Sequence, residues 1–196
     1  MSRSGVSEAS TCGGRTGHFW EWLALLFSIA ALLGSLYLSL GLKLKARPLC
    51  LYQRTFLMGV VGVLLMGRVF WRQAQPGNLA VLGFPLAVGG LAVASFHVGL
   101  EWRGGLECPR GLAGIGSAPQ QSLAAFVVLC GLLVAAGRKG ADRAPGIWHW
   151  VAGAVLGVAF AAGGIVSAPP LPPAPVVPYE TPLESCRRPF VPPEQP

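Results

Sequence analysis

The stretch Pro48-Leu-Cys-Leu-Tyr-Gln-Arg54 combines a proline, a thiol and a guanidinium within two helical turns of this 196-residue chain. Pro48 fits the first position of a helix, where a missing N–H group breaks no intrahelical hydrogen bond. Cys50 would then lie in the first turn, with Arg54 one turn later on the same face. A helix N-terminus and a guanidinium both favour a thiolate over a thiol. At a membrane surface this arrangement predicts redox chemistry. The alternative is a buried small cysteine beside an arginine that snorkels to the interface.

The composition indicates that a membrane surrounds these residues. The chain is 53% hydrophobic and 12% charged, and a soluble domain would have roughly twice that share of charged residues. Each long apolar run is close to the ~20 residues that cross the hydrocarbon as a helix. These runs predict five membrane spans, at residues 18–42, 49–70, 79–100, 120–137 and 146–168. We therefore expect an all-α integral membrane protein.

Two terminal segments flank the predicted spans. We interpret residues 1–17 as a polar leader and residues 169–196 as a proline-rich tail that is extended or disordered. Ser117, followed three residues later by Gln120, predicts a capping box at the start of the fourth span. Small residues that recur at four-residue spacing predict close approach of helices. They are Ala30/Gly34 and Gly153/Gly157/Ala161.

The formal charge of +7 does not indicate nucleic-acid binding. The basic residues are scattered over loops on both sides of the predicted membrane, and no basic stripe is interleaved with aromatic residues. We interpret them as contacts to membrane lipid headgroups. Their distribution slightly favours a cytoplasmic N-terminus. The sequence shows no phosphate loop, no hydrolase triad and no His/Cys cluster with metal-ligand spacing, so we predict no metal site.

The predicted spans assign each of the five cysteines to one side of the membrane or to its interior. An odd number of spans puts Cys50, Cys108 and Cys186 on one side of the membrane. If that side is outside the cytoplasm, disulfides can form and persist there. The tail before Cys186 can extend over ~50 Å, so a bond between Cys108 and Cys186, or between either and Cys50, is open. The alternative for Cys186 is an unpaired thiol in a disordered tail. We expect Cys130 to be an apolar packing residue in the fourth span and Cys12 to have no role.

Two stretches resemble a known family. Pro48-Leu-Cys-Leu-Tyr-Gln-Arg54 resembles the Cys-x-x-Cys-x-Tyr-Gln/Glu-Arg signature of the disulfide bond formation protein B (DsbB) family, whose members are quinone-linked membrane oxidoreductases. Phe96-His-Val-Gly-Leu-Glu-Trp102, which precedes a cysteine-bearing loop, resembles the second characteristic stretch of many bacterial members. The resemblance covers about residues 20–137. It implies a four-helix transmembrane bundle, to which this chain adds a fifth transmembrane helix and the proline-rich tail.

The resemblance also implies an activity and a location. In the family, the cysteine that matches Cys50 faces the ring of a quinone (ubiquinone or menaquinone), and the arginine that matches Arg54 helps to bind it. The loop cysteines receive electrons from a thioredoxin-like thiol oxidase outside the cytoplasm, which makes Cys108 a catalytic candidate. The implied location is the bacterial inner membrane, with the N-terminus in the cytoplasm and the tail in the periplasm.

His97 and Glu101 lie one turn apart at the end of the third predicted span. Ionisable groups at membrane depth are costly and often functional. We expect them to serve proton transfer at the quinone site. The alternative is an interfacial pair that fixes the depth of the helix.

The chain departs from the family pattern at its cysteines. Arg47 stands where the family has the first cysteine of its pair, and the loop after the third span has one cysteine, Cys108, where the family usually has two. We expect Cys186 to replace the missing loop cysteine, which would make Cys50, Cys108 and Cys186 the catalytic set of an oxidoreductase. The alternative is a non-catalytic bundle that binds a quinone or assists membrane assembly.

Overall fold

A computed structural model describes most of the chain. The described residues are 10–43, 48–70, 76–140, 145–170 and 183–190, with 173, 175, 178 and 179. Side chains are described from Gly17 onward in the first helix. Arg47, which the sequence analysis singled out, and the side chain of Cys12 lie outside the described part.

The described residues form five α-helices and one 3₁₀ turn. The helices are α1 (Ser10–Leu40), α2 (Pro48–Phe70), α3 (Pro76–Trp102), α4 (Ala118–Gly140) and α5 (Ile147–Ser167), and the turn is η1 (Leu112–Gly114). All five helices are long and apolar enough to cross a membrane. The all-α fold with five candidate spans is therefore confirmed.

The helix ends differ from the predicted span ends by a few residues. α1 begins at Ser10, inside the segment interpreted as a leader, and α3 and α4 extend beyond the predicted spans 79–100 and 120–137 at both ends. Hydropathy marks the part of a helix that lies in lipid. Backbone hydrogen bonding continues past that part until a cap or a turn ends the helix.

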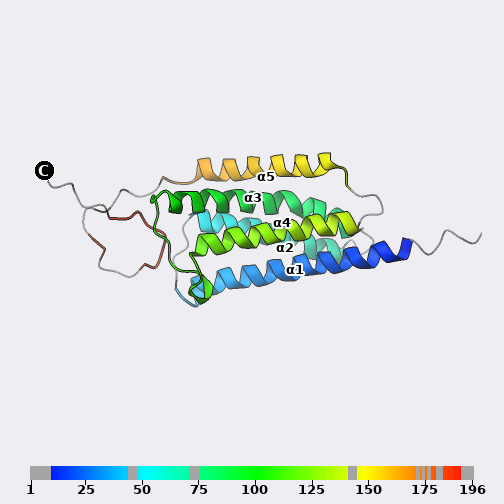
Figure 1. Cartoon of the computed structure of the whole chain (residues 1–196), viewed down its shortest axis with the longest axis horizontal. Helices are drawn as coiled ribbons and strands as arrows, with labels where there is room; N and C mark the ends of the chain where they lie inside the picture. Colours follow the sequence, from blue (N-terminus) through cyan, green and yellow to red (C-terminus); the bar gives the residue numbers. More distant parts are fainter. Residues whose placement is uncertain are drawn as a thin grey trace, which may run out of the picture.

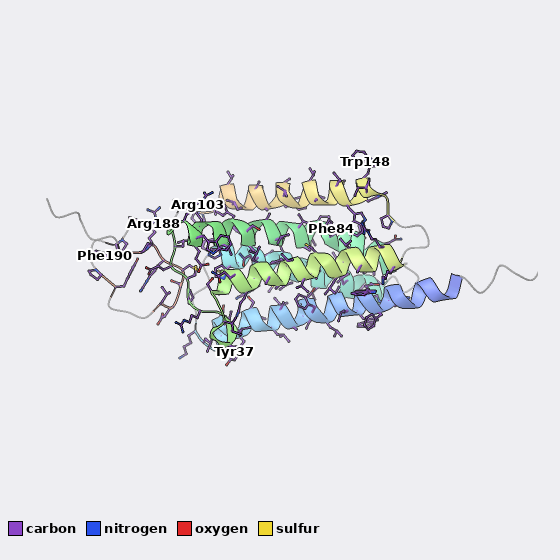
Figure 2. The ribbon with its side chains drawn as sticks, viewed as in Figure 1. Tyr37, Phe84, Arg103, Trp148, Arg188 and Phe190 are labelled. Atoms are coloured by element: carbon purple, nitrogen blue, oxygen red, sulfur yellow. A yellow bond between two sulfur atoms is a disulfide. The ribbon has the colours of Figure 1, made fainter. Side chains whose placement is uncertain are left out.

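The first four helices pack as a bundle, and the fifth lies outside it. α1 contacts α2 and α4, and α3 contacts the same two helices, while α5 packs on the outer side of α3 (Figure 1). The chain direction brings the ends of α1 and α3 and the starts of α2 and α4 to one end of the bundle. We call this the loop end, because it holds residues 103–117 and residues 183–190. Figure 2 shows Arg103 and Arg188 at the loop end and Trp148 at the opposite end.

The core of the bundle comes from one stripe on each helix. The stripe recurs at steps of three and four residues, as expected for helices buried on one side. Its members include Leu57, Val60 and Leu64 on α2, and Phe126, Leu129 and Leu133 on α4. α3 contributes small residues at the same positions, namely Ala80, Ala87 and Ala94. Because lipid is as apolar as these side chains, close packing rather than water exclusion holds the stripe together.

The close contact between α5 and α3 depends on glycine and alanine residues, whose small size lets the two backbones approach. Gly153, Gly157 and Ala161 are all buried on α5. A Cβ atom on Gly157 would collide with the backbone carbonyl oxygen of Pro85, and one on Gly153 would lie 3.1 Å from the Phe84 ring. The predicted close approach through these three residues is confirmed.

Part of the proline-rich tail is fixed on the loop after α3. Glu107 and Arg187 form an antiparallel bridge, with N–H···O=C distances of 2.8 and 2.9 Å in the two directions. The guanidinium of Arg187 stacks 3.7 Å from the centre of the Tyr179 ring, and the Tyr179 hydroxyl donates to the Arg188 carbonyl oxygen at 3.1 Å. The sequence predicted a tail that is extended or disordered, and it gave no sign of this backbone pairing between the tail and the loop.

Candidate redox site

A disulfide joins the tail to the loop. Cys108 and Cys186 are bonded across 78 residues of sequence. They directly adjoin the Glu107–Arg187 bridge, so two backbone hydrogen bonds hold the two cysteines opposite each other. Of the pairings left open by the sequence, this is the one formed. The alternative of an unpaired Cys186 is wrong, since its sulfur is bonded and its side chain is only 5% exposed.

A cavity of about 200 Å³ lies beside this disulfide. Its walls come from α1, α2 and α4, from the loop and from the tail, and Cys50 and Cys186 both line it. Ala30 and Gly34 also line it, so the first of the two predicted small-residue sets borders an open space rather than a close helix contact. At Gly34 the neighbour is the loop: an added Cβ atom would lie 3.1 Å from Leu112.

Cys50 and Arg54 occupy the positions that the sequence predicts. Pro48 is the first residue of α2, so Cys50 lies in the first turn, and Arg54 lines the same cavity one turn later. Arg54 is held against the last turns of α1. Its Nε donates to Ser35 Oγ at 3.2 Å, and its Nη2 donates to the Ser35 carbonyl at 2.9 Å and to Ser39 Oγ at 2.8 Å. The guanidinium is therefore a fixed part of the cavity wall, placed near the negative end of the α1 dipole.

A chain of polar contacts leads from the cavity to the disulfide. Ser122, which lines the cavity, donates to Gln53 Oε1 at 2.7 Å. Gln53 Nε2 lies 3.5 Å from His97 Nδ1, and His97 Nε2 lies 3.6 Å from Cys108 Sγ. Gln53 and His97 are 6% and 1% exposed. His97 is therefore buried within the protein, where it contacts the disulfide.

Glu101 belongs to a different network. Its Oε2 accepts a hydrogen bond from Ser117 Oγ at 2.7 Å. Ser117 Oγ also accepts from the Gln120 N–H, and Gln120 Oε1 accepts from the Ser117 N–H, each at 3.4 Å. These reciprocal bonds confirm the predicted capping box of α4. Glu101 does not line the cavity. It ties the end of α3 to the start of α4.

The remaining cysteine with a described side chain is a packing residue. Cys130 is half-buried against the main core of the bundle, on the fourth turn of α4, as expected. It takes part in none of the contacts above.

Six polar residues that line the cavity were not predicted from the sequence: Ser35, Ser39, Gln53, Gln121, Ser122 and Ser185. A signal was present for two of them. Ser35 and Ser39 lie one turn apart near the end of an apolar span, where a donor on a facing helix can be expected. Gln53 follows Cys50 by three residues and therefore shares its face, but its contact with α3 depends on the helix packing.

Comparison with known proteins gives one match. The family model described as Disulfide bond formation protein DsbB matches residues 17–124. No curated protein and no solved structure matches the chain. The matched range takes in α1 to α3, the loop with Cys108 and the first turns of α4. It leaves out α5 and Cys186. Since the match covers more than half of the chain, and includes the cavity-lining turn of α2, we conclude that this multi-pass membrane protein belongs to the DsbB family of disulfide bond formation proteins.

Proposed function

We propose that the protein is a membrane thiol–disulfide oxidoreductase that passes electrons from a thioredoxin-like extracytoplasmic protein to a quinone. The observation that carries this proposal is that two cysteines, one of them in a disulfide, line one cavity. Cys186 is bonded to Cys108, and Cys186, Cys50 and Arg54 all line that cavity. A disulfide persists in an oxidising compartment. This supports a bacterial inner-membrane location with the loop end in the periplasm.

The cavity suits a quinone. Phe27, Leu57 and Phe126 supply apolar walls for a flat ring, and an apolar cavity of ~150 Å³ already admits benzene. The hydrogen bonds of Arg54 use Nε and Nη2, so its Nη1 hydrogens remain available within the described part of the chain to a carbonyl oxygen. A bound quinone would accept two electrons and two protons as two thiols become a disulfide.

The three sulfurs replace the two dithiol pairs of the family. A thiolate of the partner protein attacks the Cys108–Cys186 bond and forms a mixed disulfide. The second partner thiol then attacks the mixed disulfide, which leaves an oxidised partner and two thiols on Cys108 and Cys186. Cys186 next pairs with Cys50 as the electrons leave for the quinone. The Cys108 thiolate attacks Cys186, which restores the original bond and returns Cys50 to a thiolate.

His97 serves proton transfer in this cycle. Its Nε2 faces Cys108 Sγ at 3.6 Å, and Gln53 contacts Nδ1 on the other side of the ring. Nε2 takes the thiol proton once the Gln53 amide rotates to place its oxygen at Nδ1, because the ring hydrogen is then on Nδ1. Gln53 and Ser122 continue the contact chain to the cavity, where the reduced quinone would need protons. We assign Glu101 a positioning role, because it fixes α3 against α4 and does not reach the cavity.

The test is quinone reduction by a reduced dithiol protein, measured on the full chain in lipid nanodiscs with a short-chain ubiquinone. Cys50→Ser and Cys186→Ser should each reduce turnover to the uncatalysed background, because each removes a sulfur that the cycle needs. Cys130→Ser, a cysteine of the same helical bundle outside the site, should keep full turnover. Unchanged turnover in Cys50→Ser would overturn the site assignment.

A non-catalytic bundle is the second candidate, and the family position occupied by Arg47 favours it. Peptide mapping of the Cys108→Ser variant under non-reducing conditions separates the two. The oxidoreductase should accumulate a Cys50–Cys186 disulfide once quinone is added. A non-catalytic bundle, whose native bridge only anchors the tail, should show no such bond.

A further inference from the structure

The sulfurs of the disulfide and the ring of His97 also form a group of metal-ligand atoms. His97, Cys108 and Cys186 each offer one nitrogen or sulfur atom, and these atoms all lie within 4.8 Å of one another. The sequence predicted no metal site because the three residues are far apart along the chain. His97 precedes Cys108 by 11 residues, and Cys186 follows by 78 more.

We propose that the reduced protein binds one Zn²⁺ ion through Cys108 Sγ, Cys186 Sγ and His97 Nε2. Tetrahedral zinc with Zn–N and Zn–S bonds of about 2.05 and 2.3 Å separates nitrogen from sulfur by about 3.6 Å. The distance between His97 Nε2 and Cys108 Sγ is 3.6 Å. The two sulfurs would lie about 3.8 Å apart at such an ion, which two thiolates reach once their bond is broken.

The backbone prepares the two sulfurs for a common ligand. The Glu107–Arg187 hydrogen bonds adjoin both cysteines and do not depend on the S–S bond. Reduction therefore leaves Cys108 and Cys186 facing each other next to the imidazole. The contact of Gln53 with His97 Nδ1 holds the ring from behind. Such an outer contact is the usual support of a histidine ligand. Ligation through Nε2 leaves the ring proton on Nδ1, so the Gln53 amide would have to rotate from its present orientation, with its oxygen toward Nδ1 and its nitrogen donating to Ser122 Oγ.

The charges at the site suit a divalent cation. His97 is 1% exposed and Cys186 is 5% exposed, so an uncompensated charge there would be costly. Two thiolates and one Zn²⁺ sum to zero. Binding releases the two thiol protons and transfers no electrons. The fourth position remains open to water.

The site would exist in one redox state alone. In the oxidised chain the two sulfurs share a bond and offer no thiolate to a cation. In the reduced chain a bound ion would occupy both thiolates and keep them from disulfide exchange. Zinc would thus hold the enzyme in its reduced state until the ion leaves. This inference does not require that a quinone be the electron acceptor.

The experiment is a competition titration of the full chain in detergent, with Zn²⁺ shared between the protein and a chromophoric chelator. The reduced protein should bind one equivalent, and the oxidised protein should bind at least tenfold more weakly. Cys108→Ser and His97→Gln should each weaken binding to the reduced protein by about 100-fold or more, and Gln53→Ala by about 10-fold. Cys130→Ser is the matched control and should bind as the native chain does.

Two further measurements protect the test against variants that fail to fold. Alkylation of the thiols in the reduced native chain should abolish binding without any substitution. Co²⁺ in place of Zn²⁺ should give the absorption of a tetrahedral ion with thiolate charge-transfer bands. Equal Zn²⁺ binding by oxidised and reduced protein, or Co²⁺ spectra without those bands, would overturn the proposal. Quinone reduction by the metal-free protein reports on the proposed function separately.

Discussion

The two ends of the α1–α4 pair are packed differently. At the end away from the loop, the helices touch: a Cβ atom on Gly17 of α1 would collide with the backbone of Gly140 on α4. At the loop end the same two helices are separated by the cavity that Cys50 and Arg54 line. α1 therefore diverges from α4 along its length (Figure 1). A bundle closed tightly at one end can hold a ligand-sized space open at the other.

The two arginines of α2 show the same difference. Arg54, at the loop end, makes hydrogen bonds to serines of α1 and faces the cavity. Arg68, at the opposite end, stacks on the Trp22 ring and contacts His18 Nδ1 at 2.6 Å. Its Nε lies 3.7 Å from a carboxylate oxygen of Glu21, a residue that is 1% exposed. The first arginine lines an open cavity, and the second holds two helices together.

The largest effect on stability is expected from filling the closed end. Gly17→Leu should destabilise the protein by about 3 kcal/mol, because the added side chain meets a backbone that cannot move aside. Ala30→Leu, which places the same side chain in the cavity wall of the same helix, should change stability by about 0.5 kcal/mol or less. Thermal unfolding in detergent measures both. Equal destabilisation by the two variants would contradict the contrast between the ends.

The next effect separates the two arginines. Arg54→Ala should raise the KM for quinone by about 10- to 100-fold, the equivalent of ~1.5–3 kcal/mol for a charged hydrogen-bond donor. Arg68→Ala should leave that KM unchanged and lower the unfolding temperature instead, since it removes the partner of buried Glu21. Steady-state kinetics of quinone reduction, paired with thermal unfolding, would show whether the roles are as distinct as the contacts indicate. A rise in KM for Arg68→Ala would remove the distinction.

The smallest effect tests the hydrogen bonds that tie the end of α3 to the start of α4. Ser117→Ala removes both the cap of α4 and the hydrogen bond to Glu101, and should cost about 1 kcal/mol in stability. Glu101→Gln keeps a hydrogen-bond acceptor for Ser117 and should cost less. Quinone reduction at saturating substrate should be close to native in both variants. A large loss of turnover in Glu101→Gln with native stability would instead support the proton-transfer role at the quinone site that the sequence predicts for Glu101.

Local patterns in the sequence predicted the helices and the first turn of α2. The apolar runs marked five spans, Pro48 marked the start of α2, and Ser117 with Gln120 marked the cap of α4. Each of these signals acts within a few residues. They place Cys50 and Arg54 on one helix face without reference to the rest of the fold.

The parts that the sequence left open depend on contacts between distant segments. Cys186 reaches Cys108 because the tail pairs with the loop through backbone hydrogen bonds, which carry no side-chain signature. The contact of Gln53 with His97 requires a particular register between α2 and α3. Ala30 and Gly34 match a motif for close helix packing. In the structure Gly34 lies next to Leu112 of the loop, and both small residues line the cavity.

The disulfide also closes a covalent ring. Between Cys108 and Cys186 the chain runs through α4, the link and α5, so the fifth helix is tied into the bundle at both of its ends. Every reduction of that bond opens the ring. α5 is then held by its packing on α3, which includes Trp150 against Phe84, and by the two Glu107–Arg187 backbone hydrogen bonds. The redox state of the bond therefore decides whether the segment that carries α5, a helix outside the family match, is a closed covalent ring or an open chain.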